Sequence, residues 1–180
     1  LREHNLEQLK ETKKVVTLCP HCAVNLNKEY KKYSQINYTV EHHTQVIGHL
    51  IKEGKIKVQM KDSGKVNYHD PCNLSRMLDL VDEPRKAIMS ATNNFEELEE
   101  SGRNTLCCGA GGALWWKKET QGRTHLVRAE QVIESGADTV VTGCNFCYGM
   151  MKQGLGPLTP EGREEVLVKD VADIVAENLI

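Results

Sequence analysis

The octapeptide "VVTGCNFC", residues 140–147, joins a strand pattern to a pair of closely spaced cysteines. Its two valines continue the stretch that begins at Ala137, and a short apolar run of this kind is typical of a buried strand. A second copy, "VVTLCPHC", occupies residues 15–22. Helical spacing precedes and follows each copy, so we expect a duplicated unit. Residues 1–60 would be the C-terminal part of a first cysteine-rich unit, and residues 64–180 a complete second one.

Strand and helix patterns alternate along the chain, which indicates the α/β class, with a mainly parallel sheet and flanking helices. The expected strands cover residues 15–18, 36–40, 65–72 and 137–144, with one or two short strands on either side of Gly102. The expected helices cover residues 1–13, 20–33, 42–54, 74–80, 84–92, 112–135 and 165–180, and another begins near Asn145. Apolar residues recur at helical spacing in the last of these ranges, from Val168 to Leu179.

The bulk composition excludes several classes of protein. The 180 residues are 39% hydrophobic and 27% charged, with a net charge of −2, as in an ordinary globular protein. We expect no nucleic-acid partner, because no basic stripe is present. The longest apolar stretch, residues 106–116, is shorter than the roughly 20 residues that cross a bilayer. Since helical spacing already holds at Leu1, we expect the native chain to begin earlier, and membrane contact to come only through a missing segment or a partner.

Seven cysteines stand out from this composition. Secreted disulfide frameworks favour even cysteine counts in short, loop-rich chains, whereas this chain has an odd count and clear helical periodicity. We therefore expect reduced cytoplasmic thiols that serve metal or redox chemistry.

Five of the cysteines fall in the second unit, in three groups that each follow an expected strand. They are Cys72, Cys107, Cys108, Cys144 and Cys147. The carboxyl ends of parallel strands share one edge of a sheet, so the three groups can converge there. One zinc ion takes four ligands, whereas five sulfurs that include a vicinal pair suit a larger, polynuclear centre. Gly109, Gly111 and Gly112 would let backbone amides approach the sulfur atoms closely.

Three segments in this order and spacing resemble the CCG-type cysteine-rich domain. They are "HDPCNLSR" (69–76), "CCGAGG" (107–112) and "GCNFC" (143–147). That domain occurs in the B and D subunits of heterodisulfide reductase and in iron–sulfur subunits that oxidise lactate, glycolate and glycerol 3-phosphate. The resemblance covers the second unit in full and the first unit only at Cys19 and Cys22.

The resemblance implies a cofactor and its ligands. In the heterodisulfide reductase members, two such repeats each hold a non-cubane 4Fe–4S cluster through five cysteines, and a disulfide is split between the clusters. By position, Cys72, Cys107, Cys108, Cys144 and Cys147 would ligate one cluster, and Cys19 and Cys22 would belong to a second cluster or a zinc site. Relatives often have glycine and then arginine where this chain has Ala113 and Leu114. The branch of the family, and any substrate contact at those two positions, therefore stay open.

The preferred hypothesis is an iron–sulfur electron-transfer or reductase module of the heterodisulfide reductase type. It would pass electrons to a disulfide, a quinone-linked chain or a flavoprotein partner, beside iron–sulfur or cytochrome subunits, in the cytoplasm or at the inner face of the membrane. Whether the chain is itself an enzyme stays open. One alternative is a zinc-stabilised structural or assembly domain without redox activity. Another is a metal-free dithiol oxidoreductase that uses Cys19–Cys22 or Cys144–Cys147.

Several other residues have two interpretations each. His69 and Asp70 could orient the loop of Cys72 or move a proton, or Asp70 could simply cap a turn before Pro71. His21 could be a further ligand, although most histidines are not. The two tryptophans, Trp115 and Trp116, are expected to cover the metal centre from water. Arg76 could face an anionic substrate, but we expect it to be solvated. We expect His42, His43 and His49 to be ordinary surface or core residues.

Overall fold

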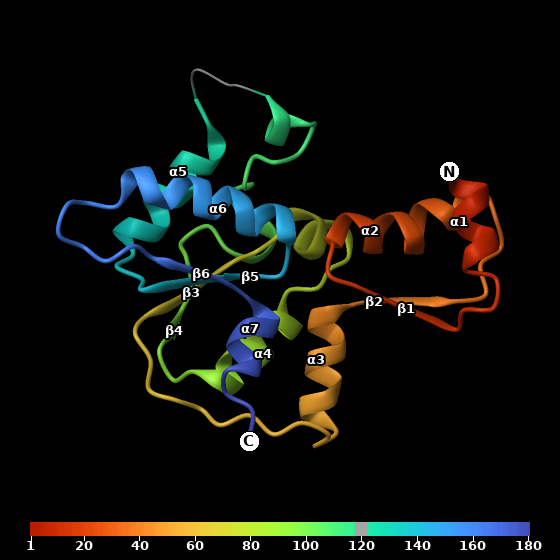
Figure 1. Ribbon diagram of the computed structural model, residues 1–180, viewed down its shortest axis with the longest axis horizontal. Coiled ribbons are helices and arrows are strands. Elements are labelled where there is room, and N and C mark those ends of the chain that lie inside the picture. Colours follow the sequence, from red (N-terminus) through yellow and green to blue (C-terminus); the bar gives the residue numbers. More distant parts are fainter. Residues whose placement is uncertain (118–121) are drawn as a thin grey trace.

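A computed structural model of the chain describes residues 1–117 and 122–180. Its central feature is a four-stranded sheet with the order β4–β3–β5–β6, in which every neighbouring pair is parallel (Figure 1). The strands are β3 (Val66–His69), β4 (Phe95–Glu96), β5 (Thr139–Thr142) and β6 (Leu167–Asp170). This arrangement confirms the expected α/β class with a parallel sheet.

Helices cover both faces of this sheet (Figure 1). They are α5 (Thr124–Glu134) and α6 (Asn145–Leu158) on one face, and α4 (Asp82–Ala91) and α7 (Val171–Ala176) on the other. Successive residues of a strand point to opposite faces, so Val140 packs in the core with Ala129 and Met151, whereas Val141 packs in a second core with Ile88. Burial on both faces explains why the sequence of β5 is apolar at consecutive positions.

The N-terminal segment forms a smaller, separate sheet. Its elements are α1 (Arg2–Gln8), β1 (Lys14–Thr17), α2 (Pro20–Val24), β2 (Thr39–His42) and α3 (His43–Lys52), and β1 pairs with β2 in parallel. A π turn (Asn25–Glu29) and a 3₁₀ turn (Tyr30–Lys32) extend α2. Helix α3 packs on α4 and α7, and the His43 Nε2 atom lies 2.7 Å from Asp170 Oδ1. The small sheet is thus joined to the large one through α3.

The same order of elements occurs in both halves of the chain. In each half a strand leads to a cysteine at the N-cap of a helix, namely Cys19 for α2 and Cys144 for α6. A parallel strand follows, and then a helix that begins with a capping box, at His42 for α3 and at Asp170 for α7. The resemblance between the two octapeptides therefore extends to the elements that surround them.

Several expected element boundaries are wrong. The range 165–180 is not one helix: Leu167–Asp170 pairs with β5, and Asp170 then caps the short α7. The helix expected over 112–135 forms only at α5, because Ala113 adopts a left-handed conformation (φ 64°) before the 3₁₀ turn Leu114–Trp116. Residues 118–121 of that range lie outside the described residues.

The other differences are smaller. Helix α1 ends at Gln8, and β2 lies at Thr39–His42 rather than at 36–40. Residues 73–77 form a π turn in place of the helix expected over 74–80. A strand, β4, precedes Gly102, but a 3₁₀ turn (Gly102–Asn104) follows there in place of a strand.

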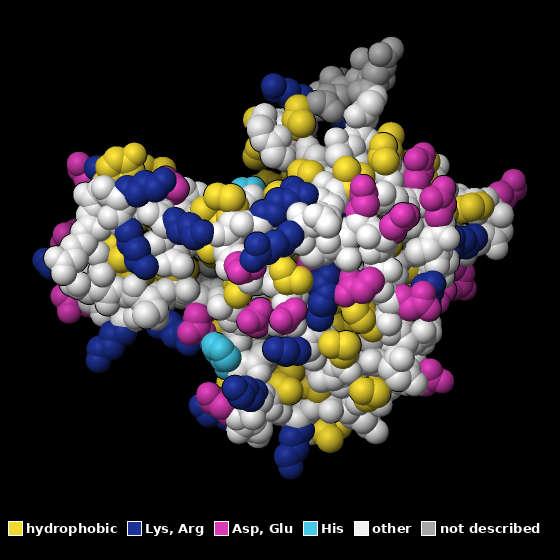
Figure 2. Space-filling view, turned by 180° about the vertical axis from the view of Figure 1, so that it is seen from behind, with side chains coloured by type: hydrophobic (Ala, Val, Ile, Leu, Met, Phe, Trp, Pro, Cys, Tyr) yellow, Lys and Arg dark blue, Asp and Glu magenta, His cyan; other side chains and the backbone are white. Residues whose placement is uncertain are grey.

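The surface shows no segregation of charge on the face seen in Figure 2, where basic and acidic side chains lie interspersed. Within the described residues, no helix has the length and apolar character needed to cross a bilayer.

Candidate metal centre

Three cysteine-bearing loops converge at one edge of the large sheet. Cys72 follows β3, and Cys144 follows β5 at the N-cap of α6, whose first turn carries Cys147. Cys107 and Cys108 lie on the loop after the 3₁₀ turn at Gly102–Asn104. All five cysteines line one cavity of about 70 Å³. The Sγ atoms of Cys108 and Cys147, which are 39 residues apart in the chain, lie 3.3 Å from each other. The sequence argument anticipated this convergence, but it was wrong to expect a strand directly before Cys107 and Cys108, which follow a 3₁₀ turn.

The five cysteine thiols differ in pKa. The pKa of Cys107 is lowered to about 2, first by its hydrogen bond with Cys108 and then by that with Cys72. The pKa of Cys144 is lowered to about 5, chiefly by Cys147 and also by a hydrogen bond from His21. The pKa values of Cys72, Cys108 and Cys147 are raised, in each case first by a neighbouring cysteine. Hydrogen bonds between neighbouring sulfur atoms thus lower the pKa of two thiols and raise that of the other three, and a metal bound here would meet sulfur ligands from three loops.

Backbone amides also point at the sulfur atoms. The Gly109 N–H group donates to Cys107 Sγ at 3.3 Å, and the amide of Ala110 lowers the pKa of Cys108. Gly109 has a φ of +83°, and a Cβ atom there would lie 3.3 Å from Thr124 Cβ, so a side chain would be strained and crowded. Gly111 lines the cavity, whereas Gly112 is not among its described lining residues and serves a left-handed turn (φ +63°).

His69, the last residue of β3, is fully buried beside the cysteines. One of its ring nitrogens and the Sγ atoms of Cys108 and Cys147 all lie within 4.8 Å of one another. Its Nδ1 accepts a hydrogen bond of 3.0 Å from Nε of Arg128, on α5. Burial, and then the charge of Arg128, lower the pKa of His69 to about 3, so its ring is neutral at physiological pH. Its Nε2 atom has no hydrogen-bond partner within the described part of the chain.

Arg128 is a residue that the sequence patterns did not single out. Its side chain is 0% exposed, which is rare for an arginine, and it also donates to Gln131 Oε1 at 2.7 Å and to Thr105 Oγ1 at 3.4 Å. The signal that could have identified it is its place in α5: His125, Arg128, Ala129 and Val132 form one buried stripe, and a charge within such a stripe is exceptional.

Asp70 fixes the loop that carries Cys72. Its buried carboxylate accepts two hydrogen bonds of 2.8 Å from Arg85 and one of 2.7 Å from the Gly102 amide. Its carbonyl oxygen accepts from Thr105 Oγ1 at 3.3 Å. These bonds reach residues 15 to 35 positions away, so Asp70 is more than the cap of a local turn. It ties the Cys72 loop to the segment that precedes Cys107.

The first CxxC motif contributes the two residues between its cysteines to the lining of the cavity. Pro20 and His21 line the cavity, whereas Cys19 and Cys22 are not among the described lining residues. A hydrogen bond with Cys144 raises the pKa of His21. His21 Nδ1 lies 3.9 Å from Cys19 Sγ, so this histidine stands between the two motifs. Burial is the first cause that raises the pKa of Cys22. The ligand roles of Cys19 and Cys22 stay predictions.

Of the two tryptophans, only Trp115 packs on the core beside the cavity. Trp115 packs on the core in a T-shaped contact with Phe146, with ring centroids 5.8 Å apart. Trp116 is 71% exposed, so the expectation that both tryptophans cover the centre is wrong for this one. Arg76 is not simply solvated, since it donates to the backbone carbonyls of Arg103 and Thr105. His42 and His43 are buried, and His49 is exposed.

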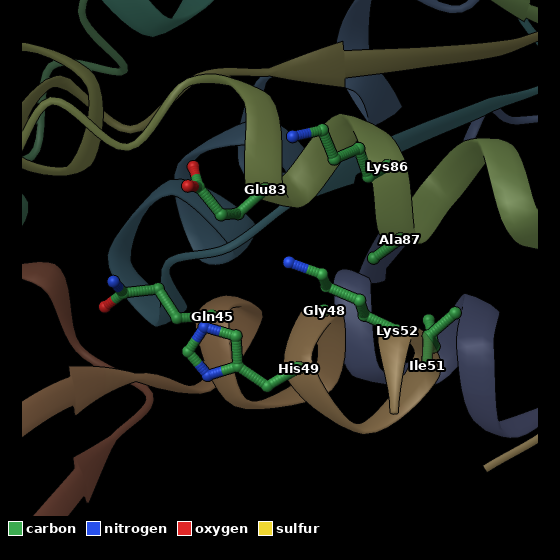
Figure 3. Close-up of a pocket in the computed structure, with 8 residues that line it drawn as sticks. All are labelled: Gln45, Gly48, His49, Ile51, Lys52, Glu83, Lys86 and Ala87. Atoms are coloured by element: carbon green, nitrogen blue, oxygen red, sulfur yellow. The ribbon is translucent and has the colours of Figure 1, made fainter. Parts of the chain in front are cut away.

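A larger cavity, of about 410 Å³, lies between α3 and α4. Figure 3 shows its lining: Gln45, Gly48, His49, Ile51, Lys52, Glu83, Lys86 and Ala87. No cysteine is among these described lining residues. The seven thiols of the chain therefore lie at the smaller cavity at the sheet edge and in the first CxxC motif beside it.

Residues 66–152 match the model of the family described as "Cysteine-rich domain" (CCG). The whole chain is 31% identical to the probable iron-sulfur-binding oxidoreductase FadF of Bacillus subtilis, of which it covers 26%. Over 97% of its length it is 32% identical to the EtfAB:quinone oxidoreductase of Syntrophomonas wolfei, again covering 26%. Over 99% of its length it is 30% identical to one subunit of the dihydromethanophenazine:CoB–CoM heterodisulfide reductase of Methanosarcina barkeri, covering 44%. The chain thus spans less than half the length of each of these relatives.

Proposed function

Residues 66–152 form a cysteine-rich domain of the CCG family, and from this premise we propose that the chain is an iron–sulfur electron-transfer module. Its five clustered cysteines would hold a 4Fe–4S cluster, of the non-cubane type. The observation that carries the proposal is the convergence of five sulfur atoms, from three loops, on one cavity at the carboxyl edge of a parallel sheet. Relatives named as iron–sulfur or quinone oxidoreductases and as a heterodisulfide reductase support this class of function.

The residues present fit an iron–sulfur cluster better than a single zinc ion. Tetrahedral zinc uses four ligands and would leave one of the five thiols over. The backbone N–H groups that point at sulfur, from Gly109 and Ala110, suit a cluster, since such hydrogen bonds adjust its reduction potential. His69 is a poor zinc ligand beside Cys108 and Cys147, because its Nδ1 accepts from Arg128 and the neutral ring then carries its hydrogen on Nε2.

The protein residues have separable tasks in this proposal. A bound cluster supplies one-electron redox chemistry. Asp70 and Arg85 keep two of the ligand loops together, and Pro20 and His21 narrow access to the cavity from the side of the first CxxC motif. The residues that would hold the cluster are Cys72, Cys107, Cys108, Cys144 and Cys147.

We also propose that residues 1–60 belong to a first unit equivalent to residues 64–180. The repeated order of strand, N-cap cysteine, helix, parallel strand and capped helix supports this division. Cys19 and Cys22 would then be two ligands of a second cluster or of zinc, completed by residues other than those of the described cavity. Electron donors and acceptors would be other redox subunits or a quinone-linked partner, at the cytoplasmic face of a membrane.

The decisive experiment is anaerobic purification or reconstitution, followed by quantitation of iron, acid-labile sulfide and zinc. We expect brown protein, broad visible absorption and four irons per occupied site. Cys108→Ala should lose the iron of the described cavity, whereas Cys22→Ser, which alters an exposed cysteine outside it, should keep that iron. A colourless wild type with one zinc and an alkylatable fifth thiol would contradict the proposal and support the zinc-stabilised domain instead.

A further inference from the structure

Arg128 is a buried cation without a carboxylate of its own. No ion pair joins it to any acidic residue in the described part of the chain. Asp70 is already bound twice by Arg85, and Glu100 accepts from Gln131 Nε2 at 2.9 Å, so both carboxylates act on Arg128 through space and neither is paired with it. A buried charge without a counter-ion is strongly unfavourable. Its position therefore indicates that negative charge is provided from the neighbouring cavity.

The hydrogen bond from Arg128 also determines where His69 carries its proton. A guanidinium N–H group can only donate, so Nδ1 of His69 must accept and cannot bear hydrogen. The neutral ring then has its proton on Nε2, the buried atom that has no partner among the described residues. One ring nitrogen of His69 and the Cys108 and Cys147 sulfur atoms lie within 4.8 Å of one another, so these two sulfur atoms are the candidate acceptors for that proton.

We propose that Arg128 and His69 together stabilise added negative charge on the cluster, with His69 donating its Nε2–H to a ligand sulfur. The inference rests on the proposed function. Both features favour the reduced state, because reduction adds one electron to a centre that already carries several thiolates. Arg128 is then a positioning residue that acts through His69 as well as through its charge, and His69 is a hydrogen-bond donor and not a metal ligand.

The test compares Arg128→Met and His69→Gln in reconstituted protein by potentiometric titration with dithionite, monitored by EPR and visible absorption. Both variants should keep the wild-type iron content and should be at least tenfold harder to reduce, a shift of about 59 mV to lower potential for one electron. Two control variants, Arg163→Met and His49→Gln, remove an arginine that donates to the carbonyls of Ile133 and Ala137 and an exposed histidine of α3. Their potentials should stay at the wild-type value.

A second measurement separates a donor from a ligand. Pulsed EPR of protein labelled with ¹⁵N-histidine should show weak nitrogen couplings from His69 and from His21, which is hydrogen-bonded to Cys144. His69→Gln should remove one of these couplings, and His21→Gln should leave that one in place. A strong coupling typical of an iron–nitrogen bond, together with iron loss in His69→Gln, would overturn the inference. Should Arg128→Met fail to fold, the neutral Arg128→Gln replaces it, and the His69→Gln data decide. Wild type without iron would overturn both proposals, whereas unchanged potentials in fully loaded variants would overturn this one alone.

Discussion

The buried ion pair between Asp70 and Arg85 gives a prediction whose size follows from the geometry. Arg85→Met removes both 2.8 Å bonds and leaves the carboxylate, 1% exposed, with only the Gly102 amide. Leaving a buried charge unpaired in this way costs about 3–5 kcal/mol. Asp70→Asn is milder, because Arg85 keeps Glu97, whose carboxylate is 42% exposed, at 2.5 Å. Its cost should be about 1–3 kcal/mol, that of an imperfect buried hydrogen bond.

The assay is equilibrium urea unfolding of the reduced, metal-free chain, followed by circular dichroism. We expect Arg85→Met to lower the free energy of unfolding more than Asp70→Asn does. In the double variant, the neutral asparagine side chain at position 70 should recover part of the loss, since no unpaired charge remains. The control is Arg103→Met, because Arg103 and its partner Asp79 are each 66% exposed and such pairs contribute about 0–1 kcal/mol. Equal losses for both single variants, or strict additivity in the double variant, would refute the reasoning.

Three further predictions concern packing, acidity and the metal. Gly149→Ala would place a Cβ atom in severe overlap with the Trp115 ring, and it should lower the free energy of unfolding by about 1–3 kcal/mol. The control is Gly156→Ala in the same helix, where a Cβ atom meets nothing closer than 3.6 Å. This variant should be neutral or stabilising in the same urea assay. The pKa of His42 is lowered to about 4 by burial and by His43. As the pH falls, His42 is therefore protonated at a higher pH in the unfolded chain than in the folded one. Stability should be intact above about pH 6.5 and lose on the order of 3 kcal/mol by pH 4, and His42→Gln should flatten that decline in urea titrations across this range. Reconstitution with iron and sulfide should raise the melting temperature relative to the metal-free chain, and an unchanged value would argue against a ligand held by three loops.

The features that could be predicted from the sequence were those with a local signature. The apolar run of β5 marked a strand buried on both faces, and cysteines at strand ends had to meet if the sheet was parallel. The helix expected over the C-terminal range was wrong because Val168, Val171 and Ile174 recur at helical spacing, although Val168 lies in β6 and the other two lie in α7. Short apolar runs do not separate the two periods.

The partners that position the site could not be predicted in this way. Arg128 lies 59 residues from His69, and Arg85 lies 15 residues from Asp70, so only the folded chain brings each pair together. The contact with Arg128 determines which ring nitrogen of His69 carries hydrogen, and no spacing in the sequence predicts that contact. The entry of His21, rather than Cys19 or Cys22, into the cavity likewise depends on how α2 packs beside α6.

The presence of Pro20 and His21 at the cavity bears on how the domain can be produced in the laboratory. A recombinant version trimmed to the family match would begin at Val66 and would discard both residues. Its sulfur atoms would then meet bulk water and dissolved dioxygen on one side, and thiolates that become accessible are readily oxidised. Expression boundaries for the iron-loaded form should therefore retain the first motif, even in work that concerns the second one alone.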